Sequence, residues 1–122
     1  MTEYGTFKNG LPRLVLSLPG KREYFTVEFV VDTGFDGDLT LPEHLARELP
    51  DATLDNRLIN LAGAFQQRCA CYEIPWKDDD GETRHIEVLV LNGNPLVGTN
   101  FLANTLLTVE LTEGGEVSAE SL

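Results

Sequence analysis

The feature that most constrains the fold is a series of short apolar runs, each of which ends in turn residues. The run 14–18 ends at Pro19-Gly20, and the next run, 24–31, is rich in β-branched and aromatic residues. Such residues favour strands, and Pro-Gly favours a turn. The two runs therefore predict a β-hairpin, whose second strand leads directly into a polar loop at residues 32–38.

The rest of the chain repeats this pattern. Strands are expected over 84–91 and 106–111, and the tail from 113 to 122 is expected to add a short strand or to fray. Residues 53–75 are interpreted as two extended arms, which form a candidate flap hairpin from about 57 to 75. A chain of 122 residues has room for one domain, so we expect a single all-β domain over residues 1–122.

One segment has a helical pattern instead. Pro42 suits the first position of a helix, and Pro50 would end it. Leu41, Leu45 and Leu49 recur at the spacing of one helical face. With a second helical turn over 99–104, the sequence predicts one or two short helices in the all-β domain.

Charge and composition argue against two classes of partner. Twenty Asp and Glu against nine Lys and Arg leave a formal charge of −11, and no basic cluster is longer than Lys21-Arg22. Binding to nucleic acid or to an anionic membrane surface depends on basic clusters, so neither partner is expected. No apolar run approaches the roughly 20 residues of a membrane span, and the first residues lack a signal-peptide pattern. A cytoplasmic location is expected.

The two cysteines, Cys69 and Cys71, are separated by one residue. On a strand we expect them to point to opposite faces, which would make a disulfide between them geometrically poor. A catalytic dyad of Cys71 with His85 is a weaker alternative, because a cysteine in an apolar strand is usually part of a core. A zinc site that adds His44 lacks the usual spacing of zinc-binding cysteines.

The segment with the most chemical content is the loop that begins at Asp32-Thr33-Gly34. A carboxylate at the end of a buried strand is costly unless its oxygens are hydrogen-bonded. Gly34 lets the backbone turn sharply and leaves its N–H free to bond an oxygen of Asp32. The Thr33 hydroxyl can brace this loop or a neighbouring copy of it.

These residues resemble the retropepsin-like aspartic proteases, in particular small bacterial and archaeal single-domain members whose loop reads Asp-Thr-Gly-Phe. The stretch from Val31 to Pro42 resembles their signature, and Leu96-Val97-Gly98 resembles the element that lies across the catalytic loop in that family. The segment around Gly63 occupies the place of the flap. The resemblance implies a closed, barrel-like β domain.

It also implies a mechanism. Aspartic proteolysis uses two carboxylates that share one proton and activate a water molecule. The chain has no second Asp followed by Ser or Thr and then Gly. The resemblance therefore implies a homodimeric aspartic-type endopeptidase with one Asp32 from each subunit, acting on a peptide or protein substrate. Asp32, Thr33 and Gly34 are the expected catalytic loop, and Phe35, Asp36, Gly63 and Ala64 the expected substrate-binding residues.

Two positions depart from the family pattern. Retropepsins commonly have an arginine after the glycine of the second motif, where it pairs with an acidic residue near the catalytic loop. Here that position is Thr99, so Asp36 must find another partner or stay solvated, whereas Asn100 matches the pattern. The candidate flap has one glycine, Gly63, where viral relatives have several.

Other interpretations remain open. Asp32, Asp36, Gly37 and Glu43 mimic part of a twelve-residue calcium loop, but position 3 is Gly34 and a strand precedes the loop. The acidic run 78–82 is interpreted as a solvated turn. No metal or other cofactor is expected. The alternative of a different class is a binding module on the same fold, which would hold a peptide without cleaving it or act on one dedicated substrate.

Overall fold

The computed structural model describes residues 1–50, 53–61, 65–78 and 81–122. Strands account for 57% of the residues and helix for 4%, which confirms the prediction of an all-β chain. No helix in the described ranges is long and apolar enough to cross a lipid bilayer.

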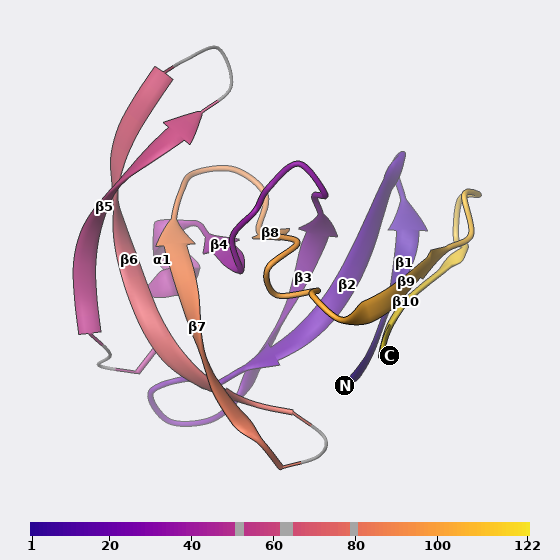
Figure 1. Ribbon diagram of the computed structural model, residues 1–122, viewed down its shortest axis with the longest axis horizontal. Coiled ribbons are helices and arrows are strands. Elements are labelled where there is room, and N and C mark those ends of the chain that lie inside the picture. The colour runs from indigo at the N-terminus through magenta and orange to yellow at the C-terminus, as the bar shows by residue number, and fades with distance from the viewer. Residues whose placement is uncertain (51–52, 62–64, 79–80) are drawn as a thin grey trace.

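The strands in the described ranges form a single sheet (Figure 1). Its order is β5-β6-β7-β4-β8-β3-β2-β1-β10-β9. The elements, in chain order, are β1 Thr2–Lys8, β2 Leu11–Leu18, β3 Phe25–Val31, β4 Leu39–Leu41, α1 Glu43–Ala46, β5 Thr53–Leu61, β6 Phe65–Lys77, β7 Thr83–Val90, β8 Leu96–Val97, β9 Thr105–Val109 and β10 Glu116–Ser121.

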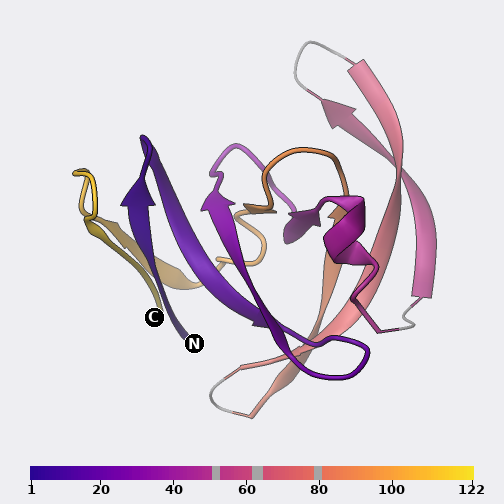
Figure 2. The same cartoon turned by 180° about the vertical axis from the view of Figure 1, so that it is seen from behind.

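The expectation of a closed barrel is wrong. Among the described residues, β5 and β9 each pair on one side only, so the sheet keeps two edges. Closure would require these two edge strands to hydrogen-bond to each other. Instead the sheet curls: β5, β6 and β7 stand on one side, and β2, β1, β10 and β9 on the other, with β3, β8 and β4 between them (Figures 1 and 2).

The main core lies inside this curl, where alternate residues of the strands point. The predicted hairpin is β2–β3, paired from Arg13 with Val30 to Leu18 with Phe25. Each fully buried aliphatic or aromatic side chain stabilises such a core by about 1.5–3 kcal/mol. The completely enclosed members come from β2, β3, β4, β6, β7, β8, β10 and the segment after β8: Leu14, Leu16, Leu18, Phe29, Leu39, Leu41, Ile74, Val88, Val97, Phe101, Val117 and Ala119.

The helical predictions hold in part. α1 begins directly after Pro42 but ends at Ala46, and the next residues continue only as single turns, with the Leu49 N–H donating to the Ala46 carbonyl at 3.1 Å. Leu41 and Leu49 are buried and Leu45 is half-buried, as the spacing predicted. Residues 99–104 form turns and not a helix.

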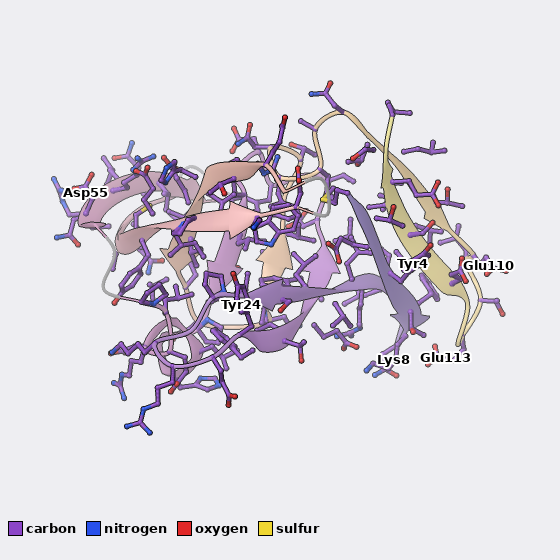
Figure 3. The ribbon with its side chains drawn as sticks, turned by 90° about the horizontal axis from the view of Figure 1, so that it is seen from below. Tyr4, Lys8, Tyr24, Asp55, Glu110 and Glu113 are labelled. Atoms are coloured by element: carbon purple, nitrogen blue, oxygen red, sulfur yellow. The ribbon has the colours of Figure 1, made fainter. Side chains whose placement is uncertain are left out.

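The chain begins with a strand that the sequence analysis did not predict. β1 pairs with β10, and its hairpin to β2 turns at Asn9 and Gly10, which have φ of 52° and 76°. Figure 3 places Tyr4, Lys8, Glu110 and Glu113 at this end of the molecule and Asp55 at the opposite end. The two termini therefore lie side by side, far from the β5–β6 hairpin (Figure 1).

Candidate functional site

The candidate site lies where three central strands interlock. β8 runs between β3 and β4, parallel to β3 and antiparallel to β4, while β4 also pairs in parallel with β7. The chain from β3 to β4 must therefore pass over β8. That passage is the loop 32–38, which the sequence predicted as the chemical centre.

Asp32 is the first residue after β3, and its position is fixed by backbone hydrogen bonds. Its N–H donates to the Val97 carbonyl at 3.0 Å, and its carbonyl accepts from the Phe35 N–H at 3.1 Å. The Gly34 N–H donates to Oδ1 of the Asp32 carboxylate at 2.9 Å, as predicted. The carboxylate is only partly buried, so it remains available to a ligand.

Gly98 permits the close approach of β8 to the loop. A Cβ atom at Gly98 would lie 2.3 Å from the Gly37 carbonyl oxygen and 2.7 Å from that of Phe35. Its N–H donates to the Asp38 carbonyl at 2.8 Å. Leu96-Val97-Gly98 therefore lies across the loop as expected, and any side chain at Gly98 would push the loop away.

Asp38 is a structural residue of the site that the sequence analysis did not single out. It is 7% exposed, and its oxygens accept hydrogen bonds from Asn100 Nδ2 at 2.8 Å and from the Glu87 N–H at 2.9 Å. It thereby ties the loop both to the segment after β8 and to β7. The sequence signal that could have identified Asp38 as a buried residue is its position immediately before Leu39, the first residue of a fully buried strand.

The other predicted loop residues have different surroundings. Thr33 is exposed, and the hydroxyl that braces the loop is that of Thr99, which donates to the Phe35 carbonyl at 3.3 Å. Phe35 is half-buried, and its ring lies against Gly37 and Gly98. Asp36 is exposed, in line with the absence of an arginine at position 99.

The candidate flap is a hairpin, as predicted. β5 and β6 pair in antiparallel register from Thr53 with Glu73 to Leu61 with Phe65. The predicted substrate-binding residues Gly63 and Ala64 lie outside the described residues.

A groove of about 930 Å³ connects the loop to the flap hairpin. Asp32, Gly34, Phe35 and Asp36 line it from the loop. The facing walls come from β5, through Arg57, Leu58 and Ile59, and from β7, through His85, Glu87 and Leu89. The arrangement places the Asp32 carboxylate in a space of the size that small ligands and short peptide segments occupy.

An ion pair links the flap hairpin to β7 across this groove wall. Arg57 on β5 and Glu87 on β7 approach to 2.7 Å, with their side chains 44% and 40% exposed. The Glu87 carboxylate, followed by Cys71, raises the pKa of Arg57 above its ordinary value.

The prediction that Cys69 and Cys71 point to opposite faces is wrong. Side chains alternate along a strand with a period of two, so residues separated by one residue share a face. Both thiols are free and buried, and they form a small cluster with Leu89, Phe35, Ile59 and Leu91 behind the groove wall. Burial raises the pKa of both thiols, an effect that the Arg57 guanidinium opposes.

The alternative chemical sites gain no support. Cys71 and His85 do not form a dyad, because in the β6–β7 register His85 stands opposite Pro75 and Cys71 stands opposite Leu89. The His85 Nδ1 instead lies 3.6 Å from Glu73 Oε1. In the described part of the chain, no three His, Cys, Asp or Glu residues are grouped to hold a metal ion. Residues 39–41, which a calcium loop would include, form strand β4.

Comparison of the chain with protein-family models, with curated proteins and with solved structures finds no match.

Proposed function

We propose that the protein is an aspartic-type endopeptidase that works as a homodimer. The observation that carries the proposal is the placement of Asp32. It follows a buried strand, it is held by the Gly34 N–H, and it faces a groove beneath a β-hairpin. This arrangement supports the role that the resemblance to retropepsin-like proteases implied for Asp32.

The loop is rigid enough for such chemistry. Backbone groups of Val97 and Gly98 hold its two ends, and Asp38 anchors it to β7 and to Asn100. Catalysis by a carboxylate depends on this kind of fixed position, because groups that are already oriented need little reorganisation during the reaction.

The second carboxylate comes from a second copy of the chain. Like charges at close range cannot both ionise, so the two Asp32 side chains share one proton. The ionised one removes a proton from a water molecule, whose oxygen bonds to the scissile carbonyl carbon. The protonated one donates a hydrogen bond to the carbonyl oxygen. Collapse of the intermediate breaks the C–N bond, and the leaving nitrogen takes up the proton that the first carboxylate removed from the water molecule.

The substrate in this proposal is an extended peptide. β5 is an edge strand along the groove, and an edge strand can pair with an extended segment through backbone hydrogen bonds. Buried, reduced thiols in the same hairpin fit a cytoplasmic setting.

The test is cleavage of a mixed peptide library from pH 4 to 7, read by mass spectrometry. Asp32→Asn keeps the size of the side chain but removes the ionisable group, so we expect cleavage to fall to background. The matched control is Glu43→Gln, which neutralises an exposed carboxylate on α1 away from the groove and should leave cleavage unchanged.

Cleavage that survives in Asp32→Asn would disprove the aspartic mechanism. If the wild-type protein forms dimers but cleaves nothing, the binding module on the same fold becomes the better account of the site.

A further inference from the structure

Negative charge is in excess among the residues that line the groove. Four carboxylates face it, those of Asp32, Asp36, Asp38 and Glu87. Within the described lining, the only permanently charged cation is Arg57. Glu87 is paired with that arginine at 2.7 Å. The oxygens of Asp38 are occupied by Asn100 and by the Glu87 N–H.

Asp36 differs from these carboxylates because it has no such partner. Among the described residues it makes no hydrogen bond or ion pair, and its side chain is exposed at the groove. The one other basic group in the lining is His85, which lies beside Glu73. Thr99, the nearest candidate on the segment after β8, directs its N–H and its hydroxyl to the Phe35 carbonyl.

Apolar side chains form part of the wall of the same groove. Leu58, Ile59, Leu89, Leu91 and Leu96 line the groove, and Leu58 is 53% exposed. A lysine or arginine side chain combines an apolar stem with a charged end, so it can cover such a wall and still present its charge to a carboxylate. An acidic side chain would meet the uncompensated negative charge and be disfavoured.

We propose that the groove selects extended peptides with a lysine or arginine close to the cleaved bond, and that Asp36 is the residue that recognises this cation. The proposal rests on the proposed function, because it names the substrate class of the same groove. Asp36 acts here as a specificity-determining residue and takes no part in bond breaking.

The experiment uses peptides from the cleaved set in which one residue is varied. Lysine, norleucine and glutamate are placed in turn at each of three positions on either side of the cleaved bond, and kcat/KM is measured. Norleucine keeps the apolar stem and removes the charge. At one position we expect kcat/KM of the wild-type protein to be roughly fivefold higher with lysine than with norleucine. This is the size of effect expected for a partly exposed ion pair. The preference should weaken as salt is added.

The variants assign the preference to one side chain. In Asp36→Asn the ratio of kcat/KM for the lysine peptide to kcat/KM for the norleucine peptide should fall to about one. Asp36→Lys should favour glutamate. The control is Glu120→Gln, which neutralises an exposed carboxylate on β10 that is not part of the groove lining, and it should keep the lysine preference.

Binding separates this proposal from the proposed function. Affinities of the same peptides for the Asp32→Asn protein, read by fluorescence anisotropy, do not depend on cleavage. Tighter binding of the lysine peptide that disappears in the Asp32→Asn, Asp36→Asn double variant supports the proposal, even if the wild-type protein cleaves nothing. Equal binding of lysine and norleucine peptides, or a lysine preference that persists without Asp36, would overturn it.

Discussion

Asp38 illustrates at the scale of one residue how the loop is held in place. A buried carboxylate is tolerated only when its oxygens are hydrogen-bonded, and here the donors come from two different parts of the chain. Removing the carboxylate would leave the Asn100 amide and the Glu87 N–H without their acceptor. The loop would also lose its connections to β7 and to the segment after β8.

We therefore expect Asp38→Ala to lower the free energy of unfolding by about 1.5–3 kcal/mol, because hydrogen bonds to a charged, buried acceptor are lost. Urea denaturation monitored by the fluorescence of the buried Trp76 measures it. Asp36→Ala is the matched control two residues earlier, and as an exposed residue it should change stability by less than about 0.5 kcal/mol. Equal effects of the two substitutions would show that Asp38 does not anchor the loop.

Residues with local chemical signals were predictable, and residues defined by distant contacts were not. Asp32 and Gly34 were identified because their hydrogen bond is formed within three residues. Asp38 stands in the same polar loop, and only its partners, 49 and 62 positions away, distinguish it from a solvated carboxylate. Thr99 in place of an arginine left two outcomes for Asp36, another partner or solvent, and that expectation came from a family pattern and not from a local signal.

Among the secondary-structure elements, β6 carries two thiols that pack between the flap hairpin and the loop 32–38. Cys69 and Cys71 share the face of β6 that carries Arg57 and Leu89 on the neighbouring strands. They pack with Phe35 of the loop, so the flap hairpin and the loop are parts of one small apolar cluster. Ionisation of these thiols would therefore disturb the packing of both the flap hairpin and the loop.

This cluster predicts how stability depends on pH. Burial raises the pKa of both thiols above the ordinary value of 9.0, so the folded protein keeps these protons at a pH where the unfolded chain releases them. The unfolded state then binds fewer protons, and the free energy of unfolding falls as the pH rises through 9 and above. Below that pH both states are protonated and the contribution is fully present.

Urea denaturation between pH 8 and 10 checks this dependence. The Cys69→Ala, Cys71→Ala double variant is the reference, because it lacks both thiols and leaves the rest of the chain unchanged. We expect the stability of wild type to decline more steeply than that of the double variant. Parallel declines would mean that the folded thiols ionise like exposed ones.

The sequence prediction missed strand β1, although one signal for it was present in the sequence. Asn9-Gly10 is a strong hairpin signal, because both residues accept the positive φ of a two-residue turn. The flanking residues of β1 are half-buried or exposed throughout, so β1 lacks the apolar run that marked the other strands. Its place in the sheet comes from pairing with β10, more than a hundred residues away.

For the whole molecule, the sheet order matters more than the number of strands. Local patterns predicted most strands, but whether β5 and β9 meet depends on twist and curl accumulated over the entire sheet. The total twist and curl of the sheet cannot be read from a local sequence pattern. The prediction of a closed barrel was therefore wrong, whereas the prediction of an all-β chain was right.

Mixing experiments test the proposed dimer. If each active site needs Asp32 from two chains, a heterodimer of wild type with Asp32→Asn is inactive. Random exchange of equal amounts should then leave about one quarter of the dimers with two intact carboxylates. We expect activity, at constant total protein, to fall with the square of the wild-type fraction. A linear decrease would mean that one chain is sufficient.

The interlocked strands also determine when the site can form during synthesis. The chain leaves the ribosome from its N-terminus, so β3 and the Asp32 loop emerge well before β8 and Asn100. Asp38 and Asn100 are 62 positions apart, and the loop has neither of its β8 contacts until that distance has been translated. A nascent or prematurely terminated chain thus carries the Asp-Thr-Gly motif without the support that orients it. The topology therefore delays formation of the candidate site until the chain has been made as far as Asn100.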